Sequence, residues 1–182
     1  MDSDNSGGAE NQQERLIQLG WVNGFVDGEG CFSIGVIRQP GGDGRSGYKT
    51  GYQVSHEFVV TQGAQSVSCL HELQEFFGVG QVIANRRHDN HREHLFRFVV
   101  RRRSDLIEVI IPFFRAHPMR TSKQRNFVKF AECVELIGAG HHLSCEWLAD
   151  IIGIAATMNR QKPRSELIRI LRGHTPNIQD TG

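Results

Sequence analysis

The chain has 182 residues, of which 38% are hydrophobic and 23% are charged, so composition excludes the disordered and fibrous classes. The formal charge is only +1, but the first 14 residues hold four acids and no Lys or Arg, which leaves 21 basic against 16 acidic residues, or +5, over residues 15–182. The four cysteines fit neither a paired metal-ligand spacing nor a secreted disulfide framework, and no apolar run is long enough to cross a bilayer. We therefore expect a mildly basic globular protein in a reducing cytoplasm, with no membrane partner and no signal or transit peptide.

The first predicted element is a helix that follows an acidic tail. Residues 1–13 lack apolar periodicity and are expected to be flexible. From Arg15 onward, apolar residues recur on most sides of a helix that stops at the glycines around 28–30. One of its faces carries Gly20, Gly24 and Asp27, and this face would let another backbone approach closely.

Two hairpins joined by a helix come next. Alternating apolar residues predict strands on both sides of the loop 40–47 and again over 81–87 and 94–102, with Phe96, Phe98 and Val100 inward and Arg97 and Val99 outward. Between the hairpins, residues 67–77 have helical spacing and stop at two glycines.

The rest of the chain is predicted to be helical. Ser104 can cap a helix that ends near Pro112, and further helices are expected around residues 127–137, 147–155 and 167–171. The order predicts an α+β fold, in which an αββαββα core with one four-stranded antiparallel sheet is followed by C-terminal helices. We expect a single domain over residues 14–173 and a flexible tail over 174–182.

The segment with the most distinctive chemistry lies at 22–32, VNGFVDGEGCF. An apolar helix ends there in Asp-Gly-Glu-Gly and passes directly into a strand, so Asp27 and Glu29 sit where the helix dipole disfavours acids. A divalent cation would reverse this penalty, because Mg²⁺ and Ca²⁺ prefer carboxylate oxygens. The alternative is a glycine-rich helix stop with two solvated acids.

The longer segment GWVNGFVDGEGCFSI resembles the signature of the LAGLIDADG homing endonucleases, an apolar helix that ends in Gly-x-x-Asp-Gly-Asp/Glu-Gly before a strand. Three more segments resemble family elements in the expected order: VVTQ at 59–62, FGVGQV at 77–82 and HPMRTSKQRNF at 117–127. The resemblance covers about residues 15–170. It implies the homing endonuclease fold, a DNA double-strand break with 3′ overhangs at a long pseudo-palindromic site, and an intron or intein origin in a bacterial cytoplasm or an organelle.

Carried over by position, the resemblance implies a catalytic set of Glu29, Gln62 and Lys123. Glu29 would be the metal-binding carboxylate at the scissile phosphate, with the Gly28 carbonyl as a further ligand. Gln62 matches a residue that positions water, and Lys123 matches a lysine near that water or the phosphate. Asp27 matches the first acid of the signature, and its role is open between helix capping and catalysis. The implied cofactor is Mg²⁺, for which Mn²⁺ or Ca²⁺ could substitute in binding.

One copy of the signature is too few for a cut in both strands. A single Glu29 offers too few ligands for a metal site, and the other Asp-Gly pair, at 43–44, has no apolar helix before it. We therefore expect a homodimer whose two-fold axis runs along the motif helix. The expected interface residues are Gly20, Asn23, Gly24 and Asp27, and Asn23 itself departs from the small Ala that is usual in the family.

The uncovered face of the sheet is expected to bind double-stranded DNA, because a two-stranded ribbon fits the major groove. Residues 81–103 hold seven Arg and two acids, and residues 115–129 hold five Lys or Arg and no acid, so both segments suit phosphate contacts. The candidate DNA-binding residues are Ser33, Gln39, Gln53, Ser55, Glu57, Asn85, Arg87, Arg97 and Arg101.

Two other functions stay open at this point. The chain could be an RNA maturase that keeps the fold and assists splicing of an intron RNA, or a catalytically silent DNA-binding regulator. The joint presence of Glu29, Gln62 and Lys123 favours the endonuclease. The triplet His88, His91 and His94 invites a zinc site, but it straddles a predicted turn with no cysteine nearby, so ordinary polar turn residues are expected.

Overall fold

The structure is a computed structural model, and it describes residues 6–39, 50–85, 94–159 and 164–173. The elements are α1 (Ser6–Glu29), β1 (Gly30–Arg38), β2 (Tyr52–Gly63), the 3₁₀ turn η1 (Ala64–Ser66), α2 (Val67–Phe77), β3 (Gln81–Asn85), β4 (Leu95–Val100), α3 (Arg103–Asp105), the π-helical η2 (Leu106–Ile110), α4 (Ile111–Ala116), α5 (Lys123–Gly138), the 3₁₀ turn η3 (His141–Leu143), α6 (Cys145–Ala156) and α7 (Ser165–Gly173). This order confirms the α+β fold with an αββαββα core followed by helices.

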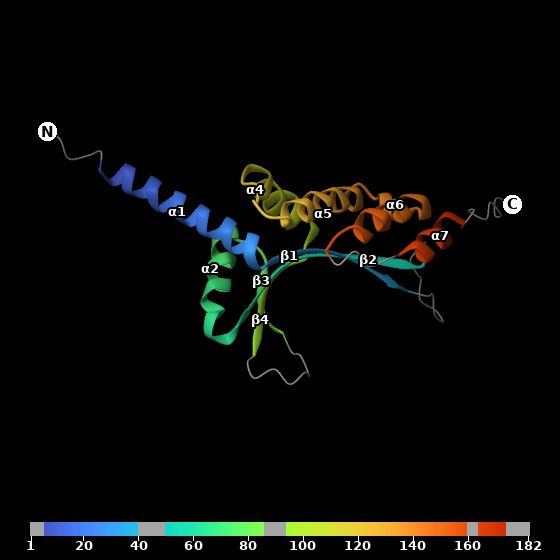
Figure 1. Ribbon diagram of the computed structural model, residues 1–182, viewed down its shortest axis with the longest axis horizontal. Coiled ribbons are helices and arrows are strands. Elements are labelled where there is room, and N and C mark those ends of the chain that lie inside the picture. The colour runs from blue at the N-terminus through green and yellow to red at the C-terminus, as the bar shows by residue number, and fades with distance from the viewer. Residues whose placement is uncertain (1–5, 40–49, 86–93, 160–163, 174–182) are drawn as a thin grey trace. The chain divides into compact units, whose positions relative to one another are not determined.

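The four strands form one sheet in the order β1-β2-β4-β3, and β4 pairs antiparallel with both β2 and β3 (Figure 1). In this register Arg97 lies opposite Thr61 of β2 and Ile83 of β3, so the three side chains share one face. Val59 and Val99 pair on that same face, and each is only 5–6% exposed. Val99 thus lies on the face of Arg97, as predicted, but it is buried there because the opposed Val59 packs against it.

Helix α1 is longer than the sequence predicts. It begins at Ser6, inside the segment 1–13 that we expected to be a tail. Every side chain from Glu10 to Gln18 is exposed, so residues 10–18 bury no apolar face, and residues 10–14 show no apolar spacing that would predict a helix. The helix ends at Glu29 as predicted. A Cβ on Gly30 would lie 2.7 Å from the Val26 carbonyl oxygen, so a glycine is needed where the chain leaves the helix.

The chain groups into two compact units, each of which is described by itself. The motif unit comprises residues 1–31 and 58–124, and the C-terminal unit comprises residues 32–57 and 125–182. Strand β2 contributes to both units. No helix in the described ranges combines the length and the apolar character that crossing a bilayer requires. The limits of the expected domain at residues 14 and 173 stay predictions, and residues 174–182 lie outside the described ranges.

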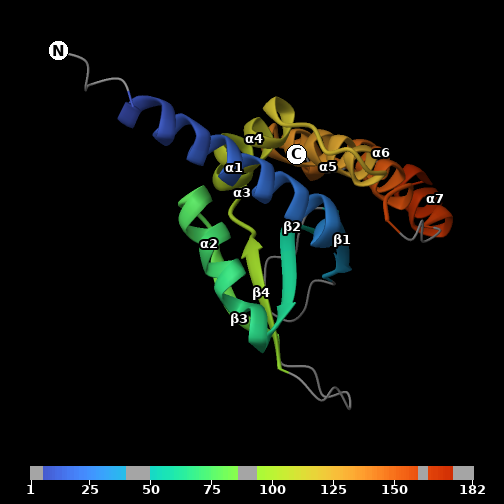
Figure 2. The ribbon, with the colours of Figure 1, turned by 60° about the vertical axis from the view of Figure 1, so that its left-hand side comes forward.

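Phenylalanine rings form the core of the motif unit. The ring of Phe58 on β2 lies 5.7–6.2 Å from the rings of Phe77, Phe98 and Phe114, all in edge-to-face geometry. Helix α2 lies along β3 and β4 and supplies Phe77 to this cluster (Figures 1 and 2). Its end at Gly78 is as predicted. These contacts fix β2 and β4 beneath the helices of the unit.

The helical segment after β4 differs from the prediction at both ends. Ser104 is not the cap, because α3 starts one residue earlier and no side chain caps it. The helix also does not stop near Pro112 but continues through α4 to Ala116. A π-helical turn, η2, ends two residues before this proline. Proline lacks an N–H and clashes with an ordinary helical turn, and the wider π turn accommodates it.

In the C-terminal unit, α5 and α6 provide the core that supports β1. Phe32 of β1 lies 5.3 Å from both Phe127 and Phe130 of α5. The side chains of Asn159 and Arg164 donate to the carbonyl oxygens of Phe32 and Ile34, at 2.9 and 3.3 Å, and so cover backbone groups of the edge strand. Helices α6 and α7 lie side by side (Figure 2). The sequence predicts all three helices of this unit.

Two glycines at the end of α2 test the packing of the motif unit. Gly80 has φ +85°, and a Cβ there would lie 2.7 Å from Phe98 and 2.8 Å from Val100. Gly78 has φ +65°, but a Cβ there would meet no atom within 4 Å. Gly80→Ala should lower the free energy of unfolding by about 3 kcal/mol, and Gly78→Ala by about 1 kcal/mol, because only the first adds a clash to the left-handed backbone. Urea denaturation measures both values, and equal losses would contradict this packing.

Candidate active site

Asp27, at the end of α1, binds a turn that lies more than 90 residues further along the chain. Its carboxylate accepts hydrogen bonds from the backbone N–H of Arg120 at 2.9 Å and of Thr121 at 3.1 Å. The hydroxyl of Thr121 donates to the other carboxylate oxygen at 2.5 Å. One turn earlier on the same helix, the amide of Asn23 donates to the Pro118 carbonyl oxygen at 3.3 Å. The carboxylate of Asp27 thus anchors the 120–121 turn, and its role, open between helix capping and catalysis, stays a prediction.

Lys123 lies at the start of α5, directly after this turn. Its ammonium nitrogen donates to the carbonyl oxygens of Val26 at 3.0 Å and Gly28 at 2.9 Å. The last carbonyl groups of a helix have no partner inside the helix, and the helix dipole favours a cation at that end. The structure therefore brings Lys123 to the end of the motif helix, and its place near the water or the phosphate stays a prediction.

The charged groups at this end of α1 shift one another's protonation. Burial alone would raise the pKa of Asp27, but the hydrogen bonds from Thr121 and Arg120 and the charge of Lys123 outweigh it, and the pKa falls below its ordinary value of 3.8. Burial lowers the pKa of Lys123, and the negative charges of Asp27, Cys31 and Glu29 only partly offset that effect. At neutral pH the end of the helix holds an ionised carboxylate beside a cation.

Glu29 and Gly28 supply the oxygen atoms for the predicted metal site. Glu29 is exposed at the last position of α1, and the Gly28 carbonyl oxygen already attracts the ammonium of Lys123. Both are hard oxygen donors of the kind that Mg²⁺ prefers. Among the described residues, no three His, Cys, Asp or Glu side chains gather into a metal cluster. The donors fit such an ion in type, and one chain provides only part of a coordination shell.

Gln62 lies near the end of β2, as predicted, but the structure does not join it to the other two catalytic candidates. In the strand register Gln62 is opposite Phe96, so its half-buried side chain is on the face opposite to that of Arg97. No hydrogen bond links its side chain to Glu29 or Lys123, all three being described residues. Its role in positioning water stays a prediction.

Two DNA-binding candidates of the motif unit share one face of the sheet, and a third lies just beyond it. Asn85 of β3 and Arg97 of β4 lie on the same side in the strand register, and Arg101 is exposed directly after β4. Arg102 and Arg103 are exposed as well, which extends the row of cations. Arg87 lies outside the described residues, as do His88 and His91.

The remaining DNA-binding candidates lie in the C-terminal unit. Ser33 is half-buried and Ser55 exposed, and Gly35 of β1 faces Ser55 of β2 in close contact. The amide of Gln39 donates to the side-chain oxygen of Gln53 at 3.1 Å. Ser33 alternates with Gly35 along β1 and therefore shares the face of Gly35 and Ser55, whereas Gln39 lies directly after β1. Glu57, the fifth, alternates along β2 with Gln53 and Ser55 and therefore shares their face.

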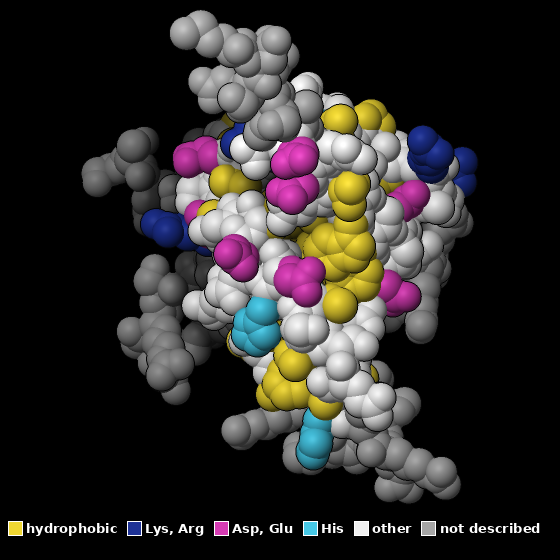
Figure 3. All heavy atoms as spheres, turned by 90° about the vertical axis from the view of Figure 1, so that its left-hand side faces the viewer, with side chains coloured by type: hydrophobic (Ala, Val, Ile, Leu, Met, Phe, Trp, Pro, Cys, Tyr) yellow, Lys and Arg dark blue, Asp and Glu magenta, His cyan; other side chains and the backbone are white. Residues whose placement is uncertain are grey.

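The predicted dimer residues divide into two kinds. Asn23 and Asp27 bind the 118–121 turn of their own unit, whereas Gly20 and Gly24 are exposed, and a Cβ on either would meet nothing within 4 Å. The sequence predicts an apolar helix buried on two sides, but Leu16 and Ile17 are 62% and 65% exposed. Figure 3 shows hydrophobic side chains with acidic side chains around them on the face that forms the left-hand side of Figure 1. Their place in a dimer interface stays a prediction.

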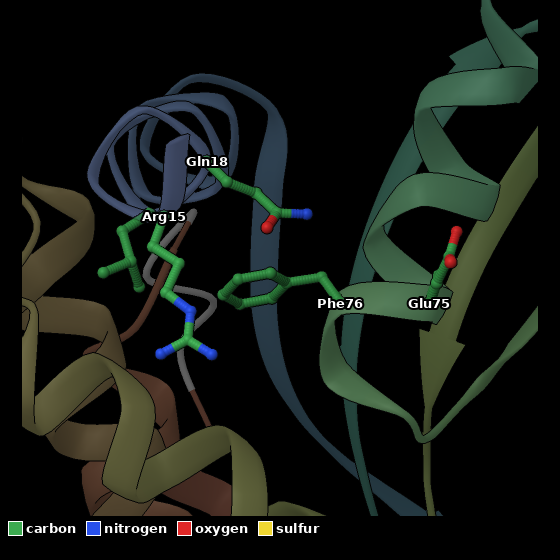
Figure 4. Close-up of a pocket in the computed structure, with 5 residues that line it drawn as sticks. Arg15, Gln18, Glu75 and Phe76 are labelled. Carbon is green, nitrogen blue, oxygen red and sulfur yellow. The ribbon is translucent and has the colours of Figure 1, made fainter. Parts of the chain in front are cut away.

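A hollow of about 440 Å³ lies between α1 and α2, lined by Arg15, Gln18, Leu19, Glu75 and Phe76. Figure 4 shows the Phe76 ring near Gln18 and the Arg15 guanidinium, and Glu75 pointing away from them. At 1.5 Å per helical residue, Arg15 is about 20 Å along the helix from Glu29. The hollow is therefore separate from the candidate active site.

The cap at Asp27 makes a specific contribution to stability as a function of pH. Because folding lowers the pKa of Asp27, its contribution is complete above the ordinary value of 3.8 and is lost as the pH falls through the folded value. Asp27→Asn should be less stable than the wild type by about 1 kcal/mol at pH 7, and the difference should shrink toward pH 3. Glu132→Gln, at an exposed acid of α5, should change little at either pH. Chemical denaturation tests this, and a pH-independent deficit for Asp27→Asn would contradict the linkage.

Comparison with known proteins places this site in a family. The model of the LAGLIDADG endonuclease family matches residues 22–134, more than half of the chain. A Neurospora crassa protein named probable intron-encoded endonuclease 2 is 30% identical over 132 residues, which cover 72% of this chain and 25% of that protein. The chain spans about a quarter of the length of the first curated relatives that it matches.

Solved structures agree with the sequence relatives. The homing endonuclease I-TnaI is 38% identical, with a TM-score of 0.68 over 85% of this chain and 95% of that one. I-SmaMI bound to an uncleaved DNA target in the presence of calcium ions is 29% identical, with a TM-score of 0.69 over 85% of this chain and 49% of that one. The chain therefore belongs to the LAGLIDADG endonuclease family.

Proposed function

We propose that this protein is a site-specific homing endonuclease that hydrolyses both strands of a long pseudo-palindromic DNA target and leaves 3′ overhangs. The observation that carries the proposal is the arrangement at the end of α1, where the exposed Glu29 carboxylate lies one residue from a carbonyl group that binds the Lys123 ammonium. The DNA and the calcium ions named for I-SmaMI support a DNA substrate and a divalent cation. The relative named as a protein in ND4 intron 1 of Podospora anserina supports an intron-encoded origin in an organelle.

The residues at the end of α1 suit phosphodiester hydrolysis. A bound Mg²⁺ ion would activate water and stabilise charge on the phosphate, and Mn²⁺ or Ca²⁺ could take its place in binding. Glu29 and the Gly28 carbonyl would hold the ion. Lys123 brings a fixed positive charge to the same end of the helix, where it can stabilise the negative charge that develops on the phosphate. Gln62 would orient the attacking water.

The strands supply the surface on which DNA would lie. Asn85 and Arg97 share a face of the sheet, and such side chains can contact base edges in the major groove. Arg101 and its two exposed arginine neighbours can contact phosphates, which makes binding sensitive to salt. Binding to an intron RNA in place of DNA would point to the maturase alternative.

Substitution of Glu29 tests the proposed chemistry. With the full chain, Mg²⁺ and a plasmid that carries the intronless form of the host gene, the wild type should cut both strands. Glu29→Gln should abolish cleavage but keep DNA affinity within about tenfold, because the sheet supplies the binding energy. Glu10→Gln, at an exposed acid of the same helix, is the matched control and should cut like the wild type. Full cleavage by Glu29→Gln, or by the wild type in excess EDTA, would refute the proposed role.

The dimer follows from the number of signatures and from the exposed side of α1. One chain carries one Glu29, and a cut in both strands needs two such sites. Gly20 and Gly24 leave room for a second helix, and the exposed Leu16 and Ile17 would be covered by it. The exposed acids Glu10 and Glu14 on the same helix would repel DNA phosphates, so this part of α1 suits a protein partner. We take that partner to be a second copy of this chain.

Replacement of Gly24 separates dimerisation from folding. The position is exposed, and leucine favours a helix by up to about 1 kcal/mol more than glycine, so Gly24→Leu should fold with an unchanged or higher Tm. Its side chain should push the two helices apart. Analytical ultracentrifugation at micromolar concentration should give about 41 kDa for the wild type, twice the 20.5 kDa chain, and half that mass for the variant. A monomeric wild type that makes complete double-strand breaks would overturn the two-fold arrangement.

A further inference from the structure

The hydroxyl group of Thr121 links the motif helix to the catalytic candidate Lys123. Its oxygen, Oγ1, donates to the Asp27 carboxylate at 2.5 Å and accepts a hydrogen bond from the backbone N–H of Lys123 at 3.2 Å. A hydroxyl has one proton to donate and lone pairs with which to accept, so a single group makes both bonds at once. Thr121 is thereby a relay between the end of α1 and the first residue of α5.

Lys123 is consequently held at both ends. Its backbone N–H is bonded to Thr121, and its ammonium group is bonded to the carbonyl oxygens of Val26 and Gly28. A lysine side chain is flexible, with four carbon atoms in its stem. The position of its backbone therefore determines whether the ammonium group can reach these two carbonyl oxygens. All these groups belong to the motif unit.

We propose that Thr121 is a positioning residue for cleavage: its hydroxyl sets the start of α5 so that the Lys123 ammonium lies against the last turn of α1, beside Glu29. The inference rests on the proposed function, since it assigns to Thr121 the placement of a group that acts on the phosphate. A displacement of about 1 Å at a reacting group can lower a rate by as much as a hundredfold. Loss of the hydroxyl should therefore cost far more in rate than in stability.

The turn itself does not depend on this hydroxyl alone. Asn23 holds the Pro118 carbonyl, the side chain of Gln124 accepts from the Met119 N–H at 3.0 Å, and the backbone N–H groups of residues 120 and 121 bind Asp27 directly. None of these contacts uses the Thr121 side chain. Thr121→Val keeps the shape of the side chain and removes only the hydroxyl, so the variant should fold.

Single-turnover cleavage of the intronless-junction plasmid tests the proposal in a double-mutant cycle. Thr121→Val should lower the rate ten- to a hundredfold with DNA affinity and Tm unchanged, and Thr121→Ser, which keeps the hydroxyl, should stay within about threefold of the wild type. In a Lys123→Met background, Thr121→Val should cause no further loss, because a residue that acts through Lys123 has no effect without it. An equal loss in both backgrounds, a loss only in DNA affinity or Tm, or no loss would overturn the proposal.

A second measurement needs no DNA. Acetylation of Lys123 by an activated acetate ester, followed by mass spectrometry, reports how firmly its amine is held. Lys129, which donates to the Thr157 carbonyl at 3.3 Å, provides the internal reference in the same digest. Thr121→Val should raise the reactivity of Lys123 relative to Lys129 about tenfold, and Thr121→Ser should not. Unchanged reactivity would refute the positioning role even if the wild type cuts no DNA, whereas failure of the wild type to cut refutes the proposed function alone.

Discussion

The carboxylate of Asp27 ties the last turn of α1 to a turn more than 90 residues away, and the candidate active site depends on that contact. Without it, the two backbone N–H groups at 120 and 121 would lose their partner, and the Thr121 hydroxyl that accepts from the Lys123 N–H would lose the acceptor of its own proton. The same contact explains why an acid is found at a helix end that the dipole makes unfavourable for it. The cost is offset by three hydrogen bonds and by a nearby ammonium.

Charge balance at the end of α1 links the fold to the proposed chemistry. The motif places two acids and two carbonyl oxygens within one turn, and in the structure Lys123 supplies the compensating cation. A divalent ion at Glu29 would add to this balance on the exposed side of the turn. In this short segment, the carbonyl oxygens of residues 26 and 28 bind Lys123, and the carboxylate of Asp27 holds the distant turn. The carboxylate of Glu29 remains exposed, where it can face a substrate.

Local patterns predict most of this structure. Alternation identified β1 to β4 and their inward residues such as Phe98, and glycines at 28–30 and at 78 marked the helix ends correctly. Patterns failed where no local signal exists. Residues 10–14 of α1 carry no apolar side chain that could indicate a helix, and Pro112 predicts a helix end where the chain instead forms a π-helical turn and continues.

The candidate site shows the same division. The resemblance predicts Glu29, Gly28 and Lys123 as site residues, and the structure brings Lys123 against Gly28. The bond from Thr121 to Asp27 could not be predicted, because it joins segments far apart in the sequence. A threonine two residues before a lysine has no distinctive meaning by itself. The exposure of Leu16 and Ile17 was not predicted for a related reason. An apolar residue on a helix normally predicts burial, and only the structure shows which apolar side chains are left uncovered.

The central claim is that the end of α1 is where the protein meets the scissile phosphate. The most direct test is a crystal structure of the full chain on its DNA target with Mn²⁺, located by anomalous diffraction. The account predicts manganese about 2.1 Å from a Glu29 carboxylate oxygen, between that residue and a backbone phosphate, with the Lys123 ammonium nearby. Manganese bound away from Glu29, for example at the histidines around residue 91, would contradict the account.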